Sequence, residues 1–161
     1  MEKKQLLNRF FLSNPFYRGL IELFLLIGSG ISGWLFSWPQ LPLFPILNIV
    51  GGVLILGSFL FHGYCERDHK QAHGKSENIE KIVENGMYSK IRHPLYLSII
   101  IMNIGVALAF GVVLALVFSL ISIVHWIMTA IAEEESLLQK FPEEYAQYQK
   151  KVHWRLIPGI F

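Results

Sequence analysis

The sequence predicts an all-α integral membrane protein with four transmembrane helices, and three observations support this class. Of the 161 residues, 53% are hydrophobic and only 16% are charged, whereas charged residues usually make up about a quarter of a soluble domain. Three long segments are almost free of charge, and the Lys and Arg residues gather in three others. A chain of this length has room for one domain, so we expect residues 1–161 to form a single membrane domain.

The first two apolar segments each have the length of one membrane span. Leu20–Trp38 contains one charged residue, Glu22, and Leu41–Phe61 contains none. A bilayer core of about 30 Å needs roughly 20 helical residues, so each segment predicts one transmembrane helix. Asn14 followed by Pro15 is typical of a helix N-cap and a first helical position, which predicts where the first helix begins.

The third apolar segment is too long for one span. Leu95–Ala132 contains no charged residue and one histidine, His125. As a single helix it would be roughly 60 Å long, at about 1.5 Å per residue. We therefore expect two helices, with the turn at Phe110-Gly111. The predicted spans are, in chain order, about 18–38, 41–62, 94–110 and 112–132.

The distribution of basic residues predicts the topology. All 14 Lys and Arg residues lie before residue 19, in the segment 63–93 or in the tail 133–161. Four spans place these three regions on one side of the membrane, and the positive-inside rule makes that side cytoplasmic. A three-span chain would put the tail on the opposite side from the basic middle segment. We expect both termini and any active site on the cytoplasmic side, because the other two connections are short.

A histidine and cysteine pattern opens the middle segment. Its members recur at helical spacing and are His62, Cys65, His69 and His73. Imidazole and thiolate are zinc ligands, but the spacing also fits a helix that leaves the membrane with a polar face. No second ligand cluster completes a known pattern, so we predict no metal site. The role of Cys65, the only cysteine, stays open.

The strongest functional signal is the pattern Gly86-x-Tyr88-x-x-x-Arg92-His93-Pro94-x-Tyr96. Pro94 suits the first turn of a helix, where its missing N–H is not needed. Arg92 and His93 then lie at the N-terminus of the third span, where free N–H groups and the helix dipole favour an anion. Basic residues beside a span are often topology anchors, but anchoring requires neither the histidine nor the tyrosines. The pattern therefore indicates a functional site at the membrane edge.

The tail adds an acidic cluster and a further helix. Glu133–Glu135 follow the fourth span directly, and carboxylates at a membrane edge lose solvation free energy unless a cation compensates. Pro142 predicts the start of another helix. On that helix Tyr145, Tyr148 and Val152 form a stripe, which we interpret as a packing surface.

Together, the segments GMYSKIRHPLY and EEESLLQKFPEEYAQYQKKV resemble the isoprenylcysteine carboxyl methyltransferases and the related phospholipid methyltransferases. The resemblance covers about residues 79–158, with the two motifs in the expected order and spacing. The chain departs from the family pattern at Ser98 and Pro142, where the family often has glycine. Neither departure removes a charged or aromatic residue of the motifs.

The resemblance implies an integral membrane enzyme that transfers a methyl group from S-adenosylmethionine to a lipophilic, membrane-resident acceptor, such as the carboxylate of a prenylated cysteine. It also implies a cofactor pocket on the cytoplasmic side and an acceptor that enters from the bilayer. The expected partners are the lipid bilayer and a lipophilic or lipidated substrate, and no nucleic acid. The identity of the methyl acceptor stays open.

By the same likeness, the cofactor is bound by Lys81, Ile82, Val83, Gly86, Tyr88, His93, Pro94, Tyr96, Glu133 and Glu134. The implied catalytic residues are Arg92, His93 and Glu134. His93 would receive the cofactor carboxylate, while Glu133 or Glu134 would bind its ammonium or ribose hydroxyls. A carboxylate acceptor needs only a cation, Arg92 or Lys150, to orient it. An amine or thiol needs a base, for which His93 or a glutamate is the candidate.

Two other interpretations stay open at this point. The R-H-P-x-Y stretch also resembles the C-terminal part of membrane sterol reductases, which bind NADPH. Those chains are longer, and the Glu133-Glu134 pair suits a cofactor with a free ammonium better than one with a 2′-phosphate. The third interpretation is a non-enzymatic small membrane protein, which failure to bind S-adenosylmethionine would favour.

Overall fold

The computed structural model describes residues 10–43, 45–69 and 78–161. The helices are, in chain order, α2 (Pro15–Leu35), α3 (Ile46–Asp68), the short 3-10 helix η2 (Gly86–Ser89), α4 (Pro94–Phe110), α5 (Val113–Lys140) and α6 (Pro142–Lys151). Within these ranges there is no β-strand, and an isolated bridge pairs Gln40 with Val112. The predicted all-α class is confirmed for this part of the chain.

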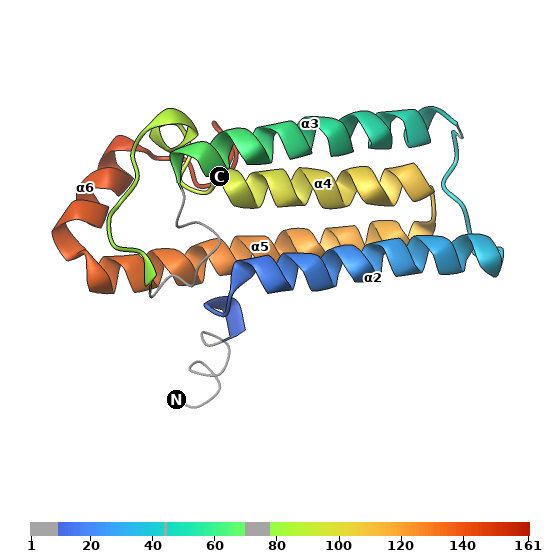
Figure 1. Cartoon of the computed structure of the whole chain (residues 1–161), viewed down its shortest axis with the longest axis horizontal. Helices are drawn as coiled ribbons and strands as arrows, with labels where there is room; N and C mark the ends of the chain where they lie inside the picture. The colour runs from blue at the N-terminus through green and yellow to red at the C-terminus, as the bar shows by residue number, and fades with distance from the viewer. Residues whose placement is uncertain (1–9, 44, 70–77) are drawn as a thin grey trace.

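The four long helices lie side by side along one axis (Figure 1). The α2–α3 and α4–α5 connections lie at one end of this bundle. At the other end α2 and α4 begin, α3 and α5 end, and α6 and the end of the chain lie beside them. The segments that carry the two sequence motifs are therefore gathered at one end.

Three of these helices, α2, α3 and α5, are long and apolar enough to cross a membrane. The fourth, α4, is also apolar but has 17 residues. The outer side of α3 presents exposed apolar side chains, among them Val53, Leu56, Phe59 and Leu60. Because an apolar surface of this extent is unfavourable in water, it indicates contact with a lipid bilayer.

Local sequence signals set two of the helix ends. The Asn14 side chain accepts a hydrogen bond from the Phe16 N–H (2.9 Å), and Pro15 lies in the first turn of α2. Between α4 and α5 the chain turns at Gly111, whose φ of 67° lies in the left-handed region that favours glycine. The start of α2 at Asn14-Pro15 and the turn at Phe110-Gly111 both lie where the sequence predicts them.

Three helices differ in extent from the predicted spans. α2 ends at Leu35 rather than at residue 38. α3 begins at Ile46 rather than at residue 41, because proline cannot continue a helix from the preceding turn and Pro42 and Pro45 interrupt the apolar segment. α5 continues to Lys140, well past the predicted end of the span at 132. Its last turns carry Glu133–Glu135 out of the apolar part of the helix toward the site described below.

Two glycines allow α3 and α4 to pack closely. A Cβ built on Gly51 of α3 would lie 2.8 Å from the Ala109 Cα and 2.6 Å from the Gly105 carbonyl oxygen, both in α4. A Cβ on Gly105 would lie 3.0 Å from the Gly51 carbonyl oxygen. Small residues at such a crossing let two membrane helices approach backbone to backbone.

A buried polar network joins α2, α4 and α5 within the apolar part of the bundle. The Glu22 carboxylate accepts hydrogen bonds from Asn103 Nδ2 (3.1 Å), Ser122 Oγ (2.8 Å) and Trp126 Nε1 (2.7 Å), and it contacts His125 Nδ1. The Arg18 guanidinium donates to His125 Nε2 (2.8 Å) and to Thr129 Oγ1 (2.7 Å). These hydrogen bonds replace water around the Glu22 carboxylate inside the apolar bundle. No partner for Glu22 can be recognised from the sequence.

Candidate active site

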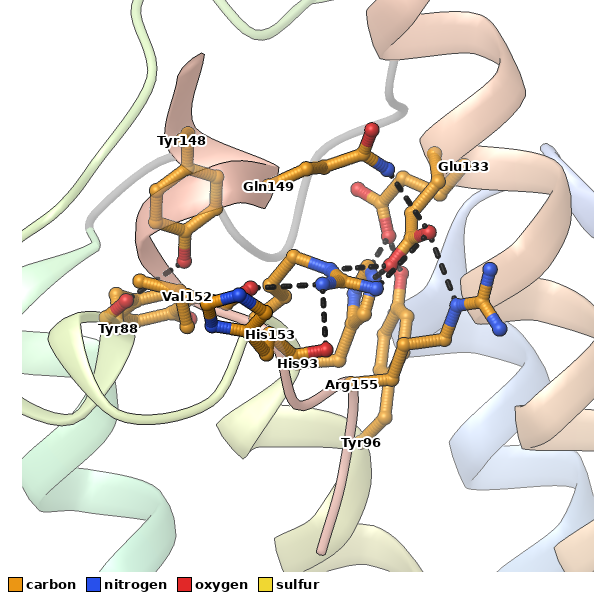
Figure 2. Close-up of polar contacts among 11 residues, drawn as sticks. Tyr88, His93, Tyr96, Glu133, Tyr148, Gln149, Val152, His153 and Arg155 are labelled. Carbon is orange, nitrogen blue, oxygen red and sulfur yellow. Dashed lines mark hydrogen bonds and ion pairs between the residues drawn. The ribbon is translucent and has the colours of Figure 1, made fainter. Parts of the chain in front are cut away.

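The C-terminal tail returns to the start of α4 and pairs with the backbone there. The Arg92 N–H donates to the Trp154 carbonyl oxygen (2.9 Å), and the His93 N–H donates to the Arg155 carbonyl oxygen (2.8 Å). The Arg92 guanidinium adds hydrogen bonds to the carbonyl oxygens of Val152 (2.7 Å) and His153 (2.9 Å) (Figure 2). The two predicted motifs and the tail thus form one connected unit.

Glu134 is the centre of this unit. Its carboxylate accepts hydrogen bonds from Arg92 Nε (2.7 Å), Arg155 Nε (2.9 Å) and Gln149 Nε2 (3.2 Å), and it lies 3.2 Å from His93 Nε2. Burial by itself raises the pKa of a carboxyl, but the hydrogen bonds and charges of these neighbours outweigh burial and lower the pKa of Glu134 to about 2. Glu134 is therefore ionised at neutral pH and connects α5 with the residues just before α4, with α6 and with the tail.

Glu133 lies next in the chain but occupies a different environment. Its Oε2 accepts a hydrogen bond from the Tyr96 hydroxyl and lies 3.6 Å from His93 Nδ1 (Figure 2). The His93 and Tyr96 rings stack in parallel, with centroids 5.3 Å apart and an interplanar angle of 3°. Glu133, His93 and Tyr96 therefore form a second polar group, in which Glu133 lies at Nδ1 of His93 while Glu134 lies at Nε2.

A narrow cavity of about 50 Å³ opens beside this second group. Its lining residues are His69, Ile79, Lys81, Ile82, Val83, Tyr88, Arg92, His93, Leu95, Tyr96, Glu133, Leu137, Tyr145 and Tyr148. The predicted residues that line it are thus Lys81, Ile82, Val83, Tyr88, Arg92, His93, Tyr96 and Glu133. Carboxylate, imidazole, guanidinium and phenol groups therefore line one cavity.

Four predicted residues do not line this cavity. Gly86 begins η2 with φ 57°, and Pro94 is buried in the first turn of α4. Glu134 contacts His93, which lines the cavity, but Glu134 does not line it itself. Lys150, the alternative cation, is exposed near the end of α6. Of the two cations considered for orienting a carboxylate acceptor, the structure therefore places Arg92 at the cavity.

Several cavity residues have no counterpart in the sequence-based prediction. Tyr145 and Tyr148 pack with Ile79 and Leu137, as expected for a packing stripe, but both also line the cavity. The Tyr148 hydroxyl donates to the Tyr88 carbonyl oxygen (2.7 Å). Burial raises the pKa of both tyrosines of α6, so their hydroxyls stay protonated at neutral pH. Their helical spacing signals burial but not which neighbouring surface they meet.

Three residues of the histidine and cysteine pattern, His62, Cys65 and His69, lie within the described part of the chain. In residues 10–43, 45–69 and 78–161, no three His, Cys, Asp or Glu side chains come together as potential ligands. His62 Nδ1 lies 2.7 Å from Ser98 Oγ, Cys65 is buried, and His69 lines the cavity beside Tyr88. His73, the fourth member of the pattern, lies outside the described residues.

Comparison with known proteins agrees with the motif-based resemblance. A family model described as phospholipid methyltransferase matches residues 43–144. The match begins just before α3 and ends in the first turn of α6. A search of curated proteins found no match to the chain.

Proposed function

The chain belongs to the phospholipid methyltransferase family, and from this premise we propose that it transfers a methyl group from S-adenosylmethionine to a lipophilic acceptor in the membrane. Family membership identifies it as a membrane methyltransferase. The methyl donor and the acceptor are the parts that we propose. One observation supports them most: the cavity that places Glu133, His93 and Arg92 together at the polar end of an apolar helix bundle.

The chemistry of the cavity residues fits this methyl donor. S-adenosylmethionine carries a sulfonium-bound methyl group together with an ammonium, a carboxylate and an adenosine. We assign the ammonium to the Glu133 carboxylate, and the carboxylate to the N-terminus of α4 beside His93. The segment Lys81–Val83 would contact the adenosine, with Gly86 shaping the turn that follows it. Since the cavity holds only about 50 Å³ and this segment belongs to no helix, we propose that Lys81–Val83 shift outward when the cofactor binds.

Some of these residues contact the cofactor or the acceptor, and others hold those residues in position. His93 faces the cavity and would accept the proton that an amine or thiol acceptor releases on methylation. Arg92 would orient an acceptor carboxylate, which needs no base. Glu134 contacts both His93 and Arg92. In this proposal it positions these two residues and does not contact the reactants itself. In this proposal the bound cofactor and acceptor displace water from the cavity, which favours direct transfer to the acceptor.

We further propose four membrane spans, α2, α3, α4 and α5, with the cavity and both termini on the cytoplasmic side. A membrane-impermeant maleimide should then label Gln40→Cys in intact cells and Glu144→Cys only in inside-out vesicles. Wild type is the control, because its only cysteine, Cys65, is buried. Labelling of both introduced cysteines from the same side would contradict the proposed topology.

The first test of the function is isothermal titration of the purified protein with S-adenosylhomocysteine and, separately, with NADPH. We expect binding of S-adenosylhomocysteine only. Glu133→Gln should weaken it about tenfold or more, because a hydrogen bond to a charged group contributes about 1.5–3 kcal/mol. Glu144→Gln, the same change at an exposed glutamate of α6, should bind like wild type.

Each other outcome of the titration has a definite meaning. Binding of NADPH alone would overturn the methyltransferase mechanism. Binding of neither would mean that the cavity is not a cofactor site. Equal binding by Glu133→Gln and Glu144→Gln would remove Glu133 from the proposed ammonium contact.

A further inference from the structure

A groove of about 260 Å³ lies between α2 and α3 on the outside of the bundle. Both helices pack on α4, which lies between them (Figure 1), and they make little contact with each other. Phe16 of α2 and Phe59 of α3 line the groove and are exposed on the bundle surface, at 48% and 69%. In a bilayer, a groove flanked by exposed phenylalanines faces lipid chains rather than water.

The groove and the candidate active site share part of their walls. Leu95 and Tyr96 line both the groove and the active-site cavity. Tyr96 also stacks on His93 and donates its hydroxyl hydrogen bond to Glu133. A molecule whose hydrocarbon chain lies in the groove therefore has its polar end beside the groups proposed to carry out methyl transfer.

The end of the groove far from the active site is bounded by the packing of α2 on α4, and one polar side chain, Asn103, lies there. Leu23, Met102 and Asn103 line this end, and in the next turn Leu26 packs against Val106 and Ala107 in the core. Asn103 is 2% exposed, and its amide donates hydrogen bonds to Glu22 (3.1 Å) and Ser122 (2.7 Å). Asn103 therefore cannot swing aside without breaking the buried network around Glu22.

These dimensions limit what the groove accepts. From Leu95 at the active-site end to Asn103 at the far end, α4 advances about 12 Å, at about 1.5 Å per residue. Lipid and groove are similarly apolar, so entry from the bilayer gains little free energy from burial alone. Selection must then come from the fit between the length of the chain and the far end of the groove.

We propose that this groove holds a single hydrocarbon chain of the methyl acceptor, and that Leu23, Met102 and Asn103 set the longest chain whose polar end still reaches Tyr96. The proposal rests on the proposed function, because the polar end is taken to be the methyl acceptor. It makes chain length, rather than apolar character alone, the basis of acceptor selection.

The test compares chain-length profiles of methyl transfer. Reconstituted protein is supplied with S-adenosylmethionine and straight-chain amines, thiols or carboxylic acids from hexyl to octadecyl, and kcat/KM is measured for each. Wild type should show a maximum at one chain length. Gly19 lines the groove, and a Cβ built on it meets only Trp126 Cζ2, at 3.7 Å. Gly19→Leu should therefore fill part of the groove, move the maximum to shorter chains and lower kcat/KM of the former optimum about tenfold, as overpacking does.

Two further variants test the direction and the specificity of this effect. Met102→Ala lengthens the groove and should move the maximum to longer chains. Gly28→Leu is the matched control, because Gly28 lies on the same helix with nothing within 4 Å of its built Cβ. Its profile should equal that of wild type. A flat wild-type profile, or identical profiles for Gly19→Leu and Gly28→Leu, would overturn the proposal.

A second readout separates this proposal from the function on which it rests. Native mass spectrometry of the protein with the alkylamine series measures retained chains without any turnover. If no compound is methylated but retention shows the same length limit and the same shifts, the proposed reaction fails and the chain-binding groove stands. If retention does not depend on length, the groove binds bilayer lipid without selection and the length limit is wrong.

Discussion

Glu134→Ala should lower the free energy of unfolding by about 3–5 kcal/mol, the usual cost of removing one partner of a buried ion pair. In the native protein the Glu134 carboxylate is 4% exposed and is shared by Arg92, His93, Arg155 and Gln149. Without it, the Arg92 guanidinium stays buried with only carbonyl oxygens as partners. The tail would then lose the ion pair between Arg155 and α5, and methyl transfer should fall below detection.

The neighbouring residue provides the control for this prediction. Glu135→Ala removes the same charge one position later, where the side chain is exposed, and should change stability by less than about 1 kcal/mol. The measurement is thermal unfolding in detergent, followed by methyl-transfer assays at a temperature where all variants are folded. If Glu134→Ala and Glu135→Ala unfold at the same temperature, Glu134 does not hold the site together.

Gly51→Ala should destabilise the protein by about 3 kcal/mol or more, at the upper end of the cost of overpacking a core. The added methyl group would meet backbone atoms of Ala109 and Gly105, which cannot move aside as a flexible side chain could. α3 and α4 would have to separate over the crossing. Because α3 and α4 both line the groove, and α4 begins at the cavity, methyl transfer should fall as well.

Gly52→Ala is the matched control for the glycine crossing. Gly52 has nothing within 4 Å of a built Cβ, and alanine favours the helix by up to about 1 kcal/mol over glycine. This variant should therefore be as stable as wild type or slightly more so. If Gly51→Ala and Gly52→Ala lower the free energy of unfolding equally, the close contact between α3 and α4 at Gly51 is not the cause of the destabilisation.

Local features of the structure follow closely from the sequence. Asn14 and Pro15 begin α2, Gly111 ends α4, and Pro142 begins α6, because capping, left-handed φ and the missing proline N–H are properties of one or two residues. Glu133–Glu135 continue α5 past its apolar part, as expected for strong helix formers.

Contacts across the fold have no such local signal. Arg155 carries no motif in the sequence, yet it binds Glu134 because the tail folds back on the start of α4. Glu22 and His125 read as isolated polar residues of two apolar segments, and only the packing of α2 against α5 brings them into contact. The double role of Tyr145, as a packing residue and a cavity residue, likewise depends on where α6 docks.

The sequence by itself determined the helical class, the turn within the long apolar segment and the two motifs that carry charge. Each of these depends only on the residue types and their spacing within one short segment of the chain. Only the tertiary structure decided that Glu133 faces the cavity while Glu134 binds the buried guanidinium of Arg92. Adjacent helical residues point about 100° apart at 3.6 residues per turn. Which of them meets the cavity depends on the rotation of α5 about its axis, and packing against α2, α4 and the returning tail sets that rotation.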